Sequence, residues 1–413
     1  MRFKWLSMGA SASIVLAGVA IPMSLASSTA GAAAKKAHAP VQILVTTPIS
    51  ATGLVANAEM TLDAIKASVT VLNKRGGILG HLVHVTYKDD AADPTTAVTE
   101  LEGAISGGQK PLAYINGGPS STAAAVLPIA GRSKVLTFNI GPTANSSVAK
   151  TFPYNFDMSP STPNYASAFC PYVKAHGGTS VGIIYGVDPY GSSLAAMMSA
   201  ACTADGVKVV GVQSFADTAI DMTPQLLALQ ALNPSYLLFE GYGSPVGYVL
   251  QDLVKIGWNV PILGDTAVAA SSNVIGAPAS QGGLLCTPDV AKLKVLVFNS
   301  TVYSKRAPVN LKTMITNINF YSNGHDPASL IFGYQYDSIQ LIAAAAKQAN
   351  SLDPTKIAKA LEHLKVGSAN TGVFPNYYFT PTVHAPNEPP SAFNFASPSY
   401  LVSGQYDGPG SGC

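Results

Sequence analysis

The sequence predicts an α/β protein made of two doubly wound lobes, each built on a parallel β-sheet. Short apolar runs alternate with helical patterns along the chain, which is the order that parallel sheets covered on both faces require. The alternation occurs as two series, one before and one after about residue 160. About 380 of the 413 residues follow a leader. Because single cores stop growing at about 250–300 residues, this length also indicates two domains.

Residues 1–33 have the features of a cleaved secretory signal peptide. Arg2 and Lys4 provide a basic start, and the apolar run Ile14–Leu25 is too short to span a bilayer. Small residues at Thr29–Ala34 offer Ala-x-Ala cleavage sites. None of the four cysteines lies near this region, so no lipobox is expected. We therefore expect a soluble protein exported to the periplasm, the cell envelope or the extracellular space.

Composition and charge exclude several classes of function. Hydrophobic residues make up 47% of the chain and charged residues only 11%, which is typical of a folded protein with an uncharged polar surface. The formal net charge is +2, and lysine and arginine are scattered without a basic stripe. We expect no nucleic-acid partner. No Walker loop, zinc-protease motif or EF-hand loop occurs, so we expect no cofactor.

The first series begins with a strand at 41–46, a loop at 47–57 and a helix at 59–73. The pair Gly76-Gly77 ends this helix as a C-cap does, and the alternation at 82–88 predicts the next strand. Asp93-Pro94 predicts a new helix, because Asp is a good N-cap and Pro is favoured at the first helical position. The remaining elements of the series are a helix at 94–105, strands at 112–115 and 135–139, and a helix between them.

The second series repeats the same order. Its expected elements are a helix at 164–176, a strand at 181–185, a helix at 192–205, a strand at 207–215, a helix at 223–232, a strand at 236–239, a helix at 245–256 and a strand at 261–263. Further helices are expected at 334–349 and 354–364, whereas the tail from Thr380 has few helical signals. No period of 20–50 residues is visible, which disfavours a solenoid.

All four cysteines follow the expected cleavage region, and an even number in an exported chain indicates up to two disulfides. Cys170 and Cys202 each lie in a predicted helix beside the strand at 181–185, and we favour this pair. A second disulfide between Cys286 and Cys413 would then fix the C-terminal tail. Metal binding is disfavoured, because there is no C-x-x-C pair and no cysteine near a histidine.

Three motifs point weakly to other functions. Gly241–Gly247 follows a strand and opens a helix, with Asp265 after the next strand, as in a dinucleotide site, but the spacing is G-x-G-x-x-x-G and Tyr242 adds bulk. Ser193 lies in a loose match to a nucleophile elbow, which suggests an exported serine hydrolase as an alternative. His81 and His84 are three residues apart on a strand and face opposite ways, so we expect no metal there.

Polar loops follow the carboxyl ends of several predicted strands, where open α/β sheets bind ligands. In the first series, Ser120 and Ser121 open a helix, whose free amides and dipole suit a carboxylate. Simple N-capping by either serine is the alternative. In the second series the loops carry carboxylates that could face an ammonium group and tyrosines that could wall a ligand. These residues are Asp188, Tyr190, Glu240, Tyr242 and Asp265.

Six segments, in this order and spacing, resemble the type 1 periplasmic binding proteins. The resemblance is to the branch of solute-binding proteins of ABC transporters, leucine-binding-protein-like, that includes branched-chain amino acid, amide and urea binders, and it covers nearly all of the mature chain. The segments are Thr47–Ser50, Leu72–Gly80, Lys88–Pro94, Gly118–Ser121, Ile183–Gly191 and Phe332–Asp337.

The resemblance implies lobe boundaries and roles for individual residues. It implies a first lobe of 41–160 plus 289–375 and a second of 161–288 plus 376–413, joined by a three-segment hinge that closes over a ligand. By motif, Ser121, Gly141 and Thr143 would hold a ligand carboxylate, Tyr190 and Tyr242 would close over it, and Asp265 or Thr266 would meet an ammonium group. Asn57 falls where the family often has an aromatic residue.

This sequence departs from the family pattern at three places. Asn139–Thr143 replaces the commoner Ser-Pro-x-x-Thr, Asp157 stands where an arginine is frequent, and Glu240 stands where a small residue is usual. An additional carboxylate facing the cleft would suit a cationic or hydroxylated ligand.

The expected function is capture of a small polar organic ligand, an amino acid or an analogue, for an ABC permease, by a monomer without catalytic activity. A ligand sensor of the same fold is an alternative to the transport role.

Overall fold

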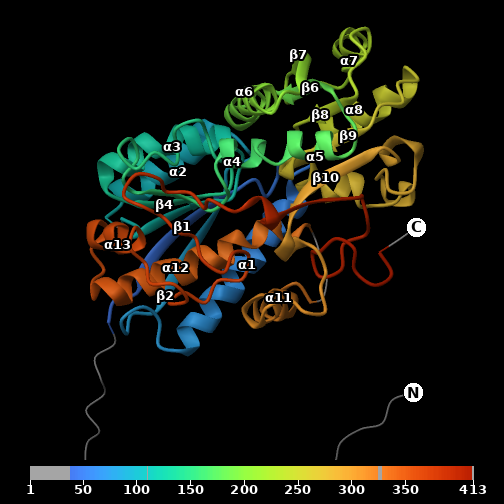
Figure 1. Cartoon of the computed structure of the whole chain (residues 1–413). Coiled ribbons are helices and arrows are strands. Elements are labelled where there is room, and N and C mark those ends of the chain that lie inside the picture. Colours follow the sequence, from blue (N-terminus) through green and yellow to red (C-terminus); the bar gives the residue numbers. More distant parts are fainter. Residues whose placement is uncertain (1–37, 109, 324–327, 412–413) are drawn as a thin grey trace, which may run out of the picture. The chain divides into compact units, whose positions relative to one another are not determined.

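The computed structural model describes residues 38–108, 110–323 and 328–411 (Figure 1). Within these ranges the chain forms two parallel-sheet α/β lobes, as the alternation of strands and helices predicts. The predicted signal peptide, residues 1–33, lies outside the described residues. In the part of the chain that is described, no helix has both the length and the apolar character to cross a membrane.

The first lobe is built on a five-stranded sheet of order β2-β1-β3-β4-β5, in which every pair of neighbours is parallel. Its elements are β1 (Val41–Thr47), α1 (Val55–Lys74), β2 (Val83–Asp89), α2 (Pro94–Ser106), β3 (Ala113–Asn116), α3 (Ser120–Ser133), β4 (Leu136–Asn139) and β5 (Asn155–Asp157). Most lie within two residues of their predicted bounds. The short edge strand β5 was not predicted.

Alternate residues of the first sheet face different helices. Leu44 of β1 and Tyr114 of β3 belong to a cluster with residues of α2 and α3. Ile43 and Ile115, their neighbours along the same strands, belong to a cluster that includes residues of α1. Because successive strand side chains point to opposite faces, these central strands carry buried apolar residues on both faces. The sheet is therefore covered on both sides, which leaves its carboxyl edge as the place for a site.

Within the described ranges, Asp-Pro pairs begin three helices. The Asp93 carboxylate accepts a hydrogen bond from the Thr96 amide at 2.7 Å, and Pro94 takes the first helical position of α2. Asp188-Pro189 begins α6 (Pro189–Ala204), and Asp353-Pro354 begins α13 (Pro354–Leu361), in the same way. The aspartate pairs an amide that the helix leaves free, and proline has no amide hydrogen to leave unpaired.

The second lobe is built on a six-stranded sheet of order β11-β10-β9-β8-β6-β7, in which only β11 is antiparallel to its neighbour. The elements in addition to α6 are α4 (Thr162–Ala166), α5 (Phe169–Ala175), β6 (Ser180–Gly186), β7 (Lys208–Phe215), α7 (Thr223–Gln230), β8 (Tyr236–Phe239), α8 (Ser244–Lys255), β9 (Ile262–Gly264), α9 (Thr266–Ala270), α10 (Ser272–Ile275), β10 (Leu293–Phe298) and β11 (Phe393–Ala396).

The chain returns to the first lobe later than expected. Strand β10 lies in the second sheet, so the return comes after Phe298 rather than at residue 289. Helices α11 (Val309–Tyr321) and α12 (Tyr334–Ala349) then both pack against α1, and α13 packs against α12 (Figure 1). The segment after β5, the segment after β10 and the segment before β11 are thus the three connections between the lobes.

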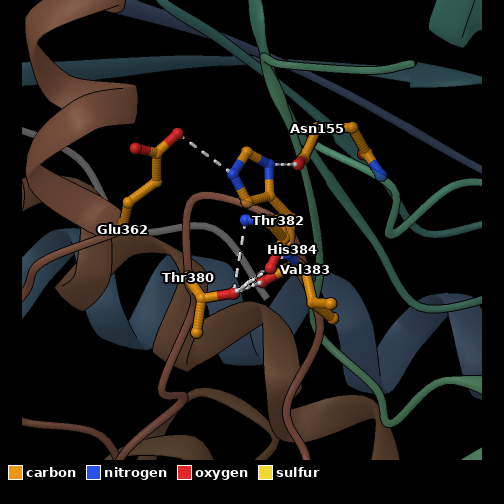
Figure 2. A network of polar contacts seen from close by, with 6 residues as sticks. All are labelled: Asn155, Glu362, Thr380, Thr382, Val383 and His384. Carbon is orange, nitrogen blue, oxygen red and sulfur yellow. Dashed lines mark hydrogen bonds and ion pairs between the residues drawn. The ribbon is translucent and has the colours of Figure 1, made fainter. Parts of the chain in front are cut away.

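The last connection is held to the edge of the first sheet by His384 (Figure 2). The His384 carbonyl oxygen accepts a hydrogen bond from the Asp157 amide at 2.8 Å, so this segment pairs with the outer side of the edge strand β5. The His384 ring is buried and stacks on Phe156. Its Nδ1 lies 2.7 Å from the Asn155 carbonyl oxygen, and its Nε2 lies 3.3 Å from Glu362 Oε1. The first lobe therefore extends to about residue 384, not 375 as the resemblance implied.

A disulfide joins Cys170 of α5 to Cys202 of α6, as the sequence predicts, with the two Cα atoms 5.1 Å apart. Both residues are fully buried beside β6. Cys286 is also disulfide-bonded. The predicted partner of Cys286, Cys413, lies outside the described residues, so that pairing stays a prediction.

Candidate functional site

A cavity of about 110 Å³ lies where loops from the two lobes meet. Its first-lobe lining follows the carboxyl ends of β1, β3 and β4, and its second-lobe lining follows those of β6, β8 and β9. This is the edge at which parallel α/β sheets bind ligands. The lining residues are Pro48, Leu54, Asn57, Gly117, Gly118, Pro119, Ser120, Ile140, Gly141, Pro142, Tyr165, Asp188, Tyr190, Tyr242, Thr266, Ala267, Ala270, Ile331, Phe332 and Tyr334.

Aromatic and aliphatic side chains form most of the wall. Four tyrosines and Phe332 line the cavity, and the rings of Tyr165 and Tyr190 meet edge to face with centroids 6.2 Å apart. Gly141 allows two first-lobe loops to approach, because a β-carbon there would come within 2.9 Å of the Ser120 nitrogen. The cavity therefore has an apolar body with a few polar groups, which is the usual character of a small-molecule site.

The two lobes are bonded to each other at one side of the cavity. The hydroxyl of Ser120, the first residue of α3, donates to Oδ1 of Asp188 at 2.5 Å and accepts from the Tyr190 amide at 3.0 Å. Asp188 is the N-cap of α6, and its Oδ1 also accepts from the amide of Tyr190 at 2.8 Å. Oδ1 of Asp188 thus accepts hydrogen bonds both from the first turn of a second-lobe helix and from a first-lobe hydroxyl.

Tyr190 is fixed by a second set of bonds at its phenol end. Its hydroxyl donates to Oδ2 of Asp265 at 2.7 Å and lies 3.3 Å from the Thr266 hydroxyl. Asp265 is the N-cap of α9 and accepts from the Val268 amide at 3.0 Å. Because both ends of Tyr190 are bonded, its ring is held as a rigid part of the wall.

Four carboxyl groups of the second lobe lie close enough to influence one another. Burial, with the Asp188 and Asp265 charges, raises the pKa of Glu240 far above its usual range. Burial raises the pKa of Asp265 to about 7, and burial together with the Asp188 charge raises that of Asp217 to about 6. Burial also raises the pKa of Asp188. Among the described residues that line the cavity, none is lysine, arginine or histidine. The raised pKa values favour the neutral forms of several of these carboxyl groups.

Three buried polar atoms of lining residues have no partner among the described residues. They are Oδ2 of Asp188, Oδ1 of Asn57 and the hydroxyl oxygen of Tyr334. Asp188 is 4% exposed and Asn57 is 5% exposed. A buried polar atom without a hydrogen bond is unfavourable by about 1–3 kcal/mol, so each of these atoms favours a rearrangement that brings a partner to it.

Of the nine ligand-binding residues expected from sequence, five line the cavity together: Asn57, Ser120, Gly141, Tyr190 and Tyr242. Four others do not line it, namely Ser121, Thr143, Glu240 and Asp265. Glu240 points instead to the turn from β6 to α6. Its Oε2 accepts a hydrogen bond from the amide of Gly186, the last residue of β6, at 2.9 Å, and a β-carbon on Gly191 of α6 would collide with it. The Thr143 amide is used by Ser146 Oγ at 2.8 Å.

Asp157, the other departure from the family pattern, also does not line the cavity. Its two oxygens accept from Ser146 Oγ at 2.6 Å and from Asn155 Nδ2 at 2.9 Å.

The sequence reasoning missed Tyr165, Phe332 and Tyr334. Phe332 and Tyr334 belong to one of the six segments that resemble the family, and that resemblance could have pointed to them. Nothing in the local sequence distinguishes Tyr165 as a lining residue.

The motifs for other functions occupy ordinary structural positions. The Ser193 hydroxyl lies within α6 and pairs with the Thr162 hydroxyl at 2.8 Å. His81 Nδ1 lies 2.7 Å from the Ala39 carbonyl oxygen, and His84 Nδ1 lies 2.9 Å from Gln42 Oε1. No group of three or more potential metal ligands occurs within the described ranges.

Comparison with known proteins agrees with this architecture. The family model described as periplasmic binding protein matches residues 40–394. The chain belongs to the periplasmic binding protein family. It is a type 1 member, in the branch of the leucine/isoleucine/valine-binding proteins. Members of this family are solute-binding proteins that are exported and that work with ABC transporters.

The relatives of this periplasmic binding protein are distant but match most of its length. It is 22% identical over 324 residues to the leucine-, isoleucine-, valine-, threonine- and alanine-binding protein of Pseudomonas aeruginosa, covering 78% of this chain and 82% of the relative. A type 1 periplasmic binding protein from Bordetella pertussis superposes with a TM-score of 0.75 at 19% identity, covering 87% of this chain and 96% of that one. A leucine-binding protein from Thermotoga maritima gives 0.71 at 20% identity, covering 86% and 98%.

Proposed function

We propose that this periplasmic binding protein captures one small polar organic solute, an amino acid or an analogue of one, between its lobes and delivers it to an ABC importer. The observation that carries the proposal is the cavity itself, which is lined from both lobes beside the Ser120–Asp188 bond. A ligand that contacts both walls would favour the closed arrangement over an open one, because only closure makes both sets of contacts.

The lining supports a ligand with an apolar body and a polar end. Tyr165, Tyr190, Tyr242, Phe332 and Tyr334 offer ring faces and edges to an apolar side chain. Asn57, Ser120 and Asp188 are polar residues of the lining, beside which a polar group could lie. The name of the Pseudomonas aeruginosa relative includes five amino acids, four of them with aliphatic side chains, which agrees with a ligand of this kind.

The proposed role is binding without chemistry, by a monomer. Ser193, the candidate nucleophile, has a hydroxyl of Thr162 as its partner rather than a base. Delivery to an importer requires release without change of the ligand, so binding should be saturable and no product should form.

Isothermal titration of the purified mature protein against amino acids, their amides and urea tests the proposal. We expect one-to-one saturable binding of at least one compound, with each compound recovered unchanged by mass spectrometry. Turnover of a panel compound that Ser193→Ala abolishes would overturn the binding-protein role. For delivery, deletion of the gene should abolish uptake of the radiolabelled ligand by intact cells; undiminished uptake would contradict the importer role.

A further inference from the structure

We infer that the segment after β11 ties the two walls of the cavity to each other and so favours the closed arrangement of the lobes. This C-terminal segment, residues 397–411, lies beyond residues 40–394, which match the family model, and it follows the three connections between the lobes. The inference goes beyond the proposed function, because it concerns the protein without any ligand.

A tight turn forms the middle of the C-terminal segment. The amide of Val402 donates to the Gln405 carbonyl oxygen at 2.9 Å, and the Gln405 amide donates to the Val402 carbonyl oxygen at 3.1 Å. Between them, Ser403 and Gly404 have φ values of 53° and 72°. Positive φ at both central residues is typical of the two-residue turns of type I′. The turn therefore presents Ser403 and Gly404 at its tip.

The tip of the turn is bonded to the first lobe. The Gly404 carbonyl oxygen accepts from the amide of Leu330 at 2.7 Å, at the start of the short 3-10 helix η4 (Leu330–Gly333). The Ser403 hydroxyl accepts from Asn319 Nδ2 of α11 at 3.0 Å, and Figure 1 shows the red C-terminal segment near α11. Both η4 and α11 pack against α1. Leu330 is buried, so withdrawal of the turn would leave a helix-start amide without this partner.

Tyr406, two residues after Gly404, is bonded to the second lobe. It is fully buried in the apolar core of that lobe, and its hydroxyl donates to the Ala269 carbonyl oxygen of α9 at 2.5 Å. Its amide donates to the Thr301 carbonyl oxygen, and its carbonyl oxygen accepts from the Tyr303 amide, both at 2.8 Å and both just after β10. Within three residues the chain thus passes from first-lobe to second-lobe contacts.

Both anchors of the segment adjoin the cavity wall. The lining residues that η4 and α9 supply, on the first-lobe and second-lobe sides, are Ile331, Phe332, Thr266, Ala267 and Ala270. An opening that moves η4 away from α9 has to break the bonds of one anchor, whereas the arrangement closed by the Ser120–Asp188 bond keeps both. Contacts that only one of two conformations makes shift the population toward it. Gly404 and Tyr406 are therefore positioning residues that favour closure.

The first-lobe anchor can be loosened at Gly404. A β-carbon there would lie 2.9 Å from the Leu330 nitrogen, so Gly404→Ala should push the tip of the turn away from η4. Gly410→Ala is the matched control, because Gly410 belongs to the same segment and has a similar φ of 80°. No described atom lies within 4 Å of a β-carbon at Gly410, so the two variants share the backbone strain and differ in the contact.

The second-lobe anchor can be loosened at Tyr406. Tyr406→Phe removes the bond to the Ala269 carbonyl oxygen and keeps the buried ring. Tyr336→Phe is the matched control, because Tyr336 is equally buried and its hydroxyl accepts from Asn317 Nδ2 at 3.2 Å, within the first lobe. Both variants lose a phenol hydroxyl from a packed core, but only Tyr406→Phe weakens a link between the lobes.

Small-angle X-ray scattering of the purified mature protein without ligand measures how far the lobes separate. We expect a larger radius of gyration in Gly404→Ala and in Tyr406→Phe than in the parent, and the parent's value in both controls. Thermal midpoints of all four variants distinguish opening from a general loss of stability. If Gly404→Ala does not fold, the comparison of Tyr406→Phe with Tyr336→Phe decides.

Two results would overturn the inference. One is a radius of gyration in the anchor variants equal to that of the parent, and the other is an increase of the same size in the controls. Because no ligand is present, either result would leave the proposed solute-binding function standing.

Discussion

The Ser120 hydroxyl on the first lobe donates a 2.5 Å hydrogen bond to the Asp188 carboxylate on the second. Both side chains are almost completely buried, and both line the cavity. A bond of this kind forms only when the lobes are together, so it links the affinity of the cavity to closure.

Ser120→Ala should therefore weaken ligand binding. A buried hydrogen bond to a charged group contributes about 1.5–3 kcal/mol, so we expect the dissociation constant of the tightest panel compound to rise at least tenfold. Isothermal titration measures this change. Ser133→Ala, at the other end of α3, is the matched control and should bind as the parent does. Equal affinities for Ser120→Ala and the control would show that the bond between lobes does not contribute to capture.

Tyr190 and Thr143 provide a second contrast. Tyr190 lines the cavity and is bonded at its phenol to Asp265, whereas Thr143 does not line it. We expect Tyr190→Ala to weaken binding at least tenfold, about 1.4 kcal/mol or more, and Thr143→Ala to have a much smaller effect. The reverse order would support the carboxylate-holding role that the family resemblance implies for Thr143, and would contradict the site geometry.

The Cys170–Cys202 disulfide should stabilise the second lobe. It closes a separation of 32 residues, for which the chain-entropy model gives about 3–4 kcal/mol. We expect the double variant Cys170→Ala/Cys202→Ala to lose roughly this free energy of unfolding in urea titrations. Peptide mapping without reductant should find the linked peptides in the parent. Free thiols at both positions in the exported protein would contradict the bond.

Buried carboxyl groups predict that stability increases as the pH falls from about 7 to about 5. Burial raises the pKa of Asp265 and of Asp337 to about 7, and that of Asp157 to about 6. In the unfolded chain these groups titrate near 3.9. Between these values the folded state binds more protons, so the free energy of unfolding falls as pH rises through this window. Burial lowers the pKa of His384, which therefore has the opposite effect on stability, but the carboxyl groups with raised pKa values outnumber it.

Thermal unfolding without ligand, measured from pH 5 to pH 8, checks this prediction. The midpoint should be highest near pH 5. Asp337 accepts from the amides of Gly372 and Val373 and from the Tyr377 hydroxyl, so Asp337→Asn should flatten the profile while preserving one acceptor. A midpoint that rises steadily toward pH 8 would contradict the raised pKa values.

Most of the fold was predictable because its signals are local. Strand-helix alternation, the Asp-Pro helix starts and the glycines after α1 each act within a few residues. The exceptions have physical causes. The single helix expected at 164–176 is two helices, because Pro171 has no amide hydrogen and fits only in the first turn of a new helix beginning at Phe169. Strand β10 is apolar at every position except Lys294, so no period of two distinguished it from helix.

The site was less predictable, because its key contacts join distant parts of the chain. Ser120 and Asp188 are 68 residues apart in sequence, and their bond depends on how two lobes meet. An N-cap aspartate looks the same from sequence whether or not it also faces a cavity. Glu240 follows a strand at the correct edge, yet it turns to the Gly186 amide under α6. Strand ends therefore indicated the loops that line the cavity, but not which side chains of each loop line it.

Native mass spectrometry of the protein purified from its exported form tests the central claim most directly. The account predicts a single small-molecule adduct, or a one-to-one adduct after addition of a panel compound, that is retained by Thr143→Ala and lost in Tyr190→Ala at the same concentrations. An adduct equally abundant in Tyr190→Ala and the parent would contradict capture in the cavity between the lobes.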